Sequence, residues 1–311
     1  MRRRTPAELG VSRASIALYR LGERCNHACP MCSNSGRAEA FFHETEELLR
    51  RARFLAGAGI RRVVVTGGEP TIHPGFWDVV AELRRLDIAW DINSNGRTFA
   101  DQTFAERAVN EGLLRAIVSL HSHEAEASAV LSGTSDKGHD GIVRGIRHLV
   151  HAGCEVMVNC VPSTYTVGKL ADFLSFCAES FGPGIQVKFA FPTTIGRGGS
   201  WPGIQLRYGD IQAEIRSLGS IGSALGLEVH FESFPPCILG DATLGDMSRS
   251  GFGETHYLDD VCGDKLYPIA HIEAELSAFP ETCRSCAALR GCPGVSEDYL
   301  RRHGATELRP L

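Results

Sequence analysis

Three cysteines near the start of the sequence have the spacing of metal-cluster ligands. They are Cys25, Cys29 and Cys32, in the segment Cys-Asn-His-Ala-Cys-Pro-Met-Cys. The sequence carries no secretory signal pattern, so we interpret them as thiolates and not as halves of disulfides. A tight loop of this kind can hold three irons of a cubane cluster. The fourth iron would then lack a protein ligand, which leaves it open to a cofactor or a substrate.

The composition limits the classes of partner. The 311 residues are 43% hydrophobic, enough for one large domain or for one domain with an appendage. A formal net charge of −5 and charges spread along the chain give no reason to expect a nucleic-acid groove. No apolar run is long enough for a membrane helix, so we expect a cytoplasmic protein with no membrane partner.

Strand and helix patterns alternate through the first 190 residues. Strand patterns cover 14–20, 61–66, 88–93, 114–119, 155–161 and 185–189, with helical patterns at 44–58, 76–86, 103–111, 140–152 and 167–180 between them. Such β/α units predict parallel strands with right-handed crossovers, an α/β fold of the partial (β/α)6 TIM-like barrel type. In these barrels the chemistry lies at the C-terminal ends of the strands.

A change of composition after the barrel predicts further units. We expect the barrel at 1–195, a connecting helix and strand at 196–231, and a small cysteine-rich domain at 232–311. The last segment has many Gly, Pro and Cys residues and little periodicity, so bound metal would help to keep it folded.

Polar motifs follow the predicted strands. Gly67-Gly68-Glu69 comes directly after the second strand, where two glycines allow the backbone to approach a ligand and a carboxylate suits a cationic amine. The next three strands end near Asn93 and Asn95, Ser119 and His121, and Asn159. For these five side chains, the capping of strand ends is the alternative role.

The cysteine loop after a first strand, in a parallel barrel pattern, resembles the signature of the radical S-adenosylmethionine (radical SAM) superfamily. The resemblance implies that Cys25, Cys29 and Cys32 bind a [4Fe-4S] cluster whose open iron is chelated by SAM. It also implies SAM-binding roles for Met31, Gly67, Gly68, Glu69, Asn93, Asn95, Ser119, His121 and Asn159. Met31 would lie against the adenine, although packing alone could explain that residue.

The tail carries a second group of cysteines, of which Cys283, Cys286 and Cys292 resemble the run in the SPASM and Twitch extensions of radical SAM enzymes. The longer SPASM run continues to a further cysteine, where this sequence has Ser296. We therefore expect one auxiliary [4Fe-4S] cluster of the shorter, Twitch-like type. Its fourth ligand is Cys237 or Cys262, with Cys237 favoured, and a zinc site on the same thiolates is the alternative.

The resemblance implies a 5′-deoxyadenosyl radical that abstracts a hydrogen atom, with electrons from a donor such as flavodoxin or ferredoxin. The auxiliary cluster would assist oxidation or rearrangement of the substrate. About 24 residues precede Cys25, too few for a leader-binding domain, which favours a small polar, sugar-like natural-product intermediate as substrate. A peptide substrate stays open. The alternative of another class is a non-catalytic iron–sulfur or zinc scaffold.

Overall fold

The computed structural model describes residues 15–33, 41–240, 255–259 and 263–311. Nine strands form one curved sheet in the order β7-β6-β5-β4-β3-β2-β1-β8-β9. Seven successive parallel strands make most of it: β1 (Ile16–Arg20), β2 (Arg62–Thr66), β3 (Ala89–Ser94), β4 (Leu113–Ser119), β5 (Glu155–Cys160), β6 (Gln186–Ala190) and β7 (Glu228–Glu232). At the other edge, β8 (Thr255–Leu258) lies parallel to β1, and β9 (Leu266–Pro268) runs antiparallel to β8.

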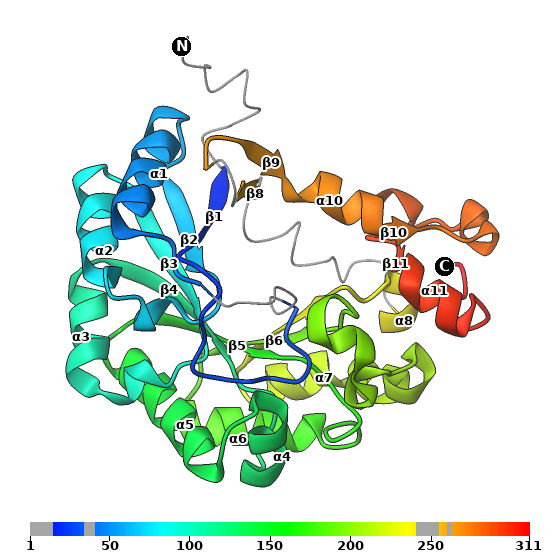
Figure 1. Cartoon of the computed structure of the whole chain (residues 1–311). Helices are drawn as coiled ribbons and strands as arrows, with labels where there is room; N and C mark the ends of the chain where they lie inside the picture. The colour runs from blue at the N-terminus through cyan, green and yellow to red at the C-terminus, as the bar shows by residue number, and fades with distance from the viewer. Residues whose placement is uncertain (1–14, 34–40, 241–254, 260–262) are drawn as a thin grey trace.

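Helices cover the outside of this sheet, and the strands surround an interior (Figure 1). They are α1 (Thr45–Gly57), α2 (Phe76–Arg85), α3 (Gln102–Asn110), α4 (Ala125–Ser132), α5 (Asp136–His151), α6 (Leu170–Phe181) and α7 (Tyr208–Ala224). In α2 the buried residues Phe76, Val79, Val80 and Leu83 recur at helical spacing, so one face packs on the strands. The expected α/β barrel class is confirmed.

The sheet continues beyond the six expected strands. β7 pairs with β6, with Lys188 opposite His230, so the strand that the sequence pattern placed in a connector is a seventh parallel strand. The change of composition after residue 191 hid this continuation. β8 comes from the segment expected as the appendage and pairs with β1. The sheet therefore crosses both expected boundaries, at 195 and at 231.

The helix α4 was not predicted. Its sequence, Ala-Glu-Ala-Ser-Ala-Val-Leu-Ser, does not separate apolar from polar residues at helical spacing. Its C-terminal end lies against the cysteine loop, so this helix helps to build the site described below.

The described part of the C-terminal segment is built from short elements. It contains α8 (Pro236–Leu239), α10 (Ile269–Leu276) and α11 (Glu297–His303), with β10 (Ser277–Ala278) and β11 (Val295–Ser296) as a two-stranded antiparallel pair. The orange and red part of this segment lies beside the open side of the barrel in Figure 1. Among the described residues, no helix is long and apolar enough to span a membrane.

Strand alternation divides the barrel into a core and a lumen. Val187 and Phe189 on β6 are fully buried in the core beneath the helices. Because successive side chains of a strand point to opposite faces, Lys188 between them faces the lumen. By the same alternation, Asn159 faces the lumen from β5, between the buried Val158 and Cys160. Cys154, Cys160 and Cys177 are buried, as expected for core cysteines.

Candidate active site

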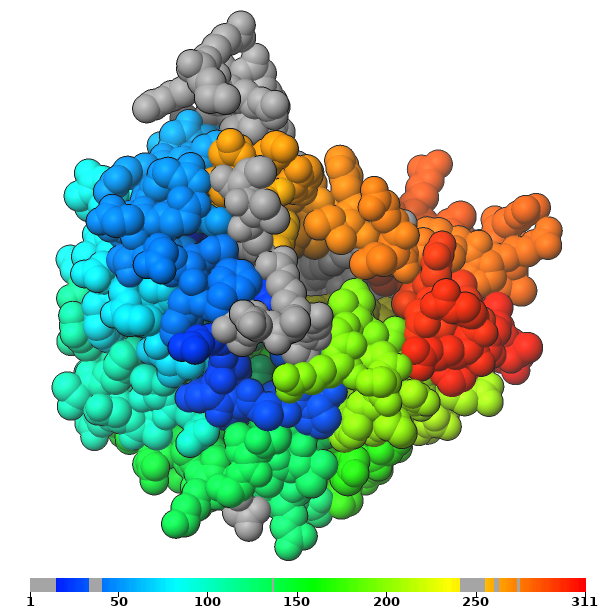
Figure 2. Space-filling model, in the orientation of Figure 1, coloured from blue at the N-terminus to red at the C-terminus, as the bar shows by residue number. Residues whose placement is uncertain are grey.

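The cysteine loop follows β1 at the C-terminal end of the strands. Its backbone is held by α4, since Ala28 N–H donates to the Ser132 carbonyl at 3.2 Å. A Cβ at Gly133, which ends α4 with a φ of +61°, would lie 2.3 Å from the Ala28 carbonyl oxygen. Glycine at this position therefore allows the close contact. Figure 2 shows the dark-blue loop across the face of the molecule, beside the green atoms of the α4 region.

The three thiols of this loop influence one another. The pKa of Cys29 is raised to about 12. Burial is the main cause, and the neighbouring thiols of Cys32 and Cys25 add to it. Burial also raises the pKa of Cys25, to which Glu69 and Cys32 add. Three thiols this close fit the ligand set of one cluster, which would bind them as thiolates and release their protons.

The two glycines of the Gly-Gly-Glu motif pack on the chain itself. A Cβ at Gly67 would lie 2.3 Å from the Gly22 carbonyl oxygen, and one at Gly68 only 2.1 Å from that of Arg24. Gly68 N–H donates to Gly22 at 3.0 Å, and Glu69 N–H donates to Arg24 at 2.8 Å. The sequence predicted a close approach to a ligand, whereas these two glycines approach the backbone that leads into Cys25.

The Glu69 carboxylate is buried and joins the ends of β2 and β3. It accepts hydrogen bonds from the Thr71 hydroxyl at 2.6 Å, the Ser94 hydroxyl at 2.9 Å and the Asn95 N–H at 2.7 Å, with a further one from Thr71 N–H at 3.2 Å. These bonds take up much of its acceptor capacity. Burial raises the pKa of Glu69, which the hydrogen bonds from Thr71, Asn95 and Ser94 oppose. A contact to a SAM ammonium group stays a prediction.

Asn95 lies between this carboxylate and the cysteine loop. Its side-chain amide donates to the Asn26 side chain at 2.6 Å and lies 3.9 Å from the Cys25 sulfur. Arg97 adds a contact to the Asn26 carbonyl at 3.4 Å. The end of β3 is therefore brought to the first cysteine, and a contact of Asn95 with SAM stays a prediction.

Two other predicted residues take part in packing or hydrogen bonding. Met31 is buried in a small apolar cluster with Leu131 and Ile204. His121 accepts a hydrogen bond from Val161 N–H at Nδ1, 3.1 Å away. Burial lowers the pKa of His121 to about 4, so this imidazole is neutral near pH 7. Ser119 lies beside Asn159 in the register of β4 and β5.

A cavity of ≈ 860 Å³ extends from the barrel lumen toward the C-terminal segment. We call it the chamber. Leu18, Val64 and Ile117 give it apolar walls on β1, β2 and β4, and Asn93, Lys188 and Glu232 line it with polar groups. Lys188 and Glu232 were not among the functional residues predicted from the sequence. The sequence does hold a signal for Lys188, because this lysine stands between the apolar residues Val187 and Phe189 of a predicted buried strand.

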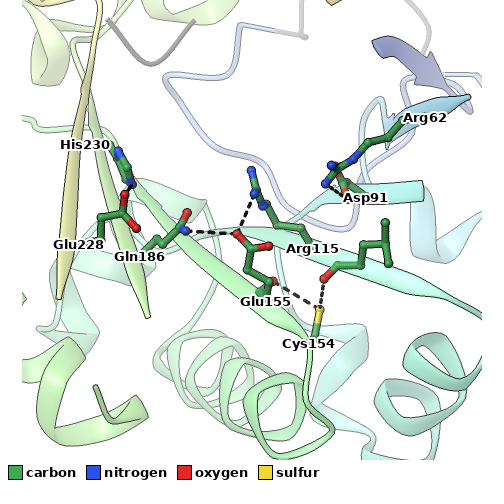
Figure 3. A network of polar contacts seen from close by, with 9 residues as sticks. Arg62, Asp91, Arg115, Cys154, Glu155, Gln186, Glu228 and His230 are labelled. Carbon is green, nitrogen blue, oxygen red and sulfur yellow. Dashed lines mark hydrogen bonds and ion pairs between the residues drawn. The ribbon is translucent and has the colours of Figure 1, made fainter. Parts of the chain in front are cut away.

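A network of polar and charged residues lies near the N-terminal ends of the strands, at the opposite end of the barrel from the cysteine loop (Figure 3). The Arg62 guanidinium donates two hydrogen bonds of 2.9 Å to the fully buried Asp91. Arg115 contacts Glu155 at 2.7 Å, and the Gln186 amide donates to the same carboxylate at 3.1 Å. These bonds join β2 to β3 and β4 to β5 and β6, so they help to fix the lumen below the chamber.

The four cysteines favoured for the auxiliary site meet at a second, small cavity. Cys237, Cys283, Cys286 and Cys292 all line it. Cys292 also lines the chamber, so the two cavities are adjacent. Within the described residues, no three His, Cys, Asp or Glu side chains are arranged to hold a single metal ion. The other candidate ligand, Cys262, lies outside the described residues.

The similarity to a known family covers the barrel from within β1 to within α6. The model of the radical SAM superfamily matches residues 19–177. A protein of Thermococcus kodakarensis named "Probable GTP 3′,8-cyclase" is 29% identical over 163 residues, 51% of this chain and 52% of that protein. This chain thus spans about half the length of such relatives. The mycofactocin maturase MftC of Mycobacterium ulcerans is 24% identical over 92% of this chain and 84% of its own.

Solved structures have a similar fold. SuiB of Streptococcus suis bound to S-adenosylmethionine superposes with a TM-score of 0.63 over 96% of this chain and 76% of its own, at 14% identity. SuiB bound to its precursor peptide SuiA gives 0.64 over 96% and 75%, at 15% identity. Both structures extend the likeness beyond the barrel into the C-terminal segment.

Proposed function

Because the chain belongs to the radical SAM superfamily, we propose that it is an enzyme that abstracts a hydrogen atom from a substrate held in the chamber. The observation that carries the proposal is the cysteine loop, held over the end of a barrel whose lumen opens into a ≈ 860 Å³ cavity. When bound at Cys25, Cys29 and Cys32, a [4Fe-4S] cluster with SAM supplies a 5′-deoxyadenosyl radical.

The residues of the chain position this chemistry. Gly67 and Gly68 place the end of β2 against the backbone before Cys25, and Glu69 ties that end to Asn95. These contacts fix the loop with respect to the lumen, and a fixed geometry is what a hydrogen-atom transfer needs. The apolar walls of the chamber would protect a radical from water.

We also propose an auxiliary [4Fe-4S] cluster on Cys237, Cys283, Cys286 and Cys292. Their shared cavity supports this ligand set and favours Cys237 over Cys262 as the fourth ligand. A cubane presents each iron to a separate thiolate, whereas zinc needs its ligands around one ion. Since Cys292 also lines the chamber, the auxiliary cluster would lie near enough to the substrate to assist oxidation or rearrangement.

The substrate we propose is a small polar molecule of natural-product biosynthesis, with electrons supplied by a flavodoxin or ferredoxin. The volume of the chamber is within the range of roughly 300–1,000 Å³ that is usual for small-ligand pockets. A peptide substrate is the second candidate, favoured by the likeness of nearly the whole chain to SuiB bound to its precursor peptide. In that case one side chain of the peptide would enter the chamber.

The test is anaerobic reconstitution with iron and sulfide, followed by dithionite and SAM. We expect 5′-deoxyadenosine from the wild type and none from the Cys25→Ala/Cys29→Ala/Cys32→Ala variant. If the wild type has intact clusters and forms no 5′-deoxyadenosine, the proposal of an enzyme is wrong and the non-catalytic scaffold is favoured. The triple variant should keep about four irons at the auxiliary site, and zinc in their place would reject the auxiliary cluster.

A further inference from the structure

An ion pair lies within the barrel lumen, apart from the cysteine loop. Lys188 Nζ contacts Glu232 Oε2 at 2.6 Å, and the Lys188 side chain is only 12% exposed. Both residues line the chamber, from the neighbouring strands β6 and β7. An ammonium carries three donors and a carboxylate two acceptor oxygens, so the pair can bind a further polar ligand while it stays intact.

Two asparagines in the lumen have buried oxygens without a partner. Asn93 lines the chamber from β3, and Asn159 lies next to Lys188 in the register of β5 and β6. Among the described residues, neither side-chain oxygen makes a hydrogen bond. Buried polar atoms are nearly always paired in native proteins, so these acceptors indicate a ligand that donates to them.

The balance of donors and acceptors defines the chemistry of that ligand. The side-chain oxygens of Asn93, Asn159 and Glu232 offer acceptors, and the Lys188 ammonium and the two asparagine amide groups offer donors. Hydroxyl groups both donate and accept, so they suit this mixed set. Glu232 already neutralises Lys188. The other acidic residues and the arginines that line the chamber, among them the paired Asp298 and Arg302, lie on α11 of the C-terminal segment. A charged ligand at Lys188 would therefore bring an uncompensated charge into the lumen. The apolar walls contributed by Leu18, Val64 and Ile117 suit a carbon skeleton.

We propose that Lys188, Glu232 and Asn93, which line the chamber, form the substrate-binding site together with Asn159, the neighbour of Lys188 on β5. In this proposal the two asparagines contact the substrate and not SAM, and the site selects an uncharged compound rich in hydroxyl groups, such as a cyclic polyol. This deepens the proposed function and rests on it only in treating the chamber as the substrate site. The four residues would orient the ring by its hydroxyls, which leaves its C–H bonds along the apolar walls.

The test measures binding of myo-inositol, a neutral polyol, to the reconstituted protein by calorimetry, with succinate as the anionic comparison. We expect myo-inositol to bind more tightly than succinate. Lys188→Met should weaken its binding by at least about tenfold, the effect of losing a hydrogen bond to a charged group. The matched control is Lys169→Met, since Lys169 forms an exposed pair with Glu124 at 2.7 Å, and it should bind as the wild type does.

Asn93→Ala gives a second measurement if Lys188→Met does not fold, and it should weaken the binding of myo-inositol severalfold. The proposal is wrong if myo-inositol does not bind, if both chamber variants bind it normally, or if succinate binds more tightly through Lys188. Formation of 5′-deoxyadenosine is scored separately. SAM cleavage without polyol binding rejects this site alone, and polyol binding without SAM cleavage rejects the proposed function alone.

Discussion

Gly68→Ala tests whether the Gly-Gly-Glu turn positions the cysteine loop. A Cβ at this residue would lie 2.1 Å from the Arg24 carbonyl oxygen and 2.4 Å from that of Glu23. Both are backbone atoms of the segment that leads directly into Cys25, so no flexible side chain can move aside. Ordinary contact begins near 3.4 Å, and the backbone must therefore shift by more than about 1 Å.

Two effects of different size follow from this shift. Overpacking of a close contact costs about 1–3 kcal/mol, which thermal or denaturant unfolding will report as a lower stability. A misplacement of about 1 Å near reacting groups lowers the rate by about 100-fold. We therefore expect the rate of 5′-deoxyadenosine formation to fall much more than the stability does.

Gly219→Ala is the matched control. Gly219 lies within α7, and nothing lies within 4 Å of the Cβ that alanine would add. Replacing a helical glycine by alanine should stabilise the protein by about 0.5–1 kcal/mol, with iron content and rate unchanged. Wild-type turnover in Gly68→Ala, with a full complement of iron, would refute the positioning role of the turn.

Three further changes test individual contacts. Glu69→Gln replaces one acceptor oxygen by a donor amide among groups that donate to it, and should lower the free energy of unfolding in denaturant by about 1–3 kcal/mol. Glu124→Gln, at an exposed ion pair, is the control and should leave the stability nearly unchanged. Cys237→Ala should lower the iron content of the reconstituted protein from about eight to about four, and Cys262→Ala should leave it unchanged; the reverse pattern would make Cys262 the ligand. Because burial lowers the pKa of His121 to about 4, below its usual value near 6.5, the unfolded chain takes up this proton first. The neutral His121 therefore contributes its full stability above pH 6.5, and this contribution falls by roughly 3 kcal/mol as the pH is lowered toward 4. In His121→Asn the loss of stability between pH 6.5 and pH 4 should be smaller. A variant with the same pH profile of stability as the wild type would contradict this expectation.

Local patterns in the sequence determined much of this protein. The spacing of Cys25, Cys29 and Cys32 predicts one loop, because residues so close along the chain cannot separate far. Apolar runs and helical periodicity predict the parallel barrel, since each strand and helix must bury its own apolar face. The position of Gly67-Gly68-Glu69 after β2 also follows from the order of these elements.

Tertiary structure decided which distant groups meet. Pairing at one edge of the sheet brings β8 to β1, and the pairing of β6 with β7 places Lys188 beside Glu232 across 44 residues of sequence. Packing likewise gives the Glu69 carboxylate its partners on β3 and brings Cys237 to a cavity shared with the tail cysteines. Periodicity tells which face of a strand is buried, whereas these contacts depend on the order and register of all the strands in the sheet, which no local pattern encodes.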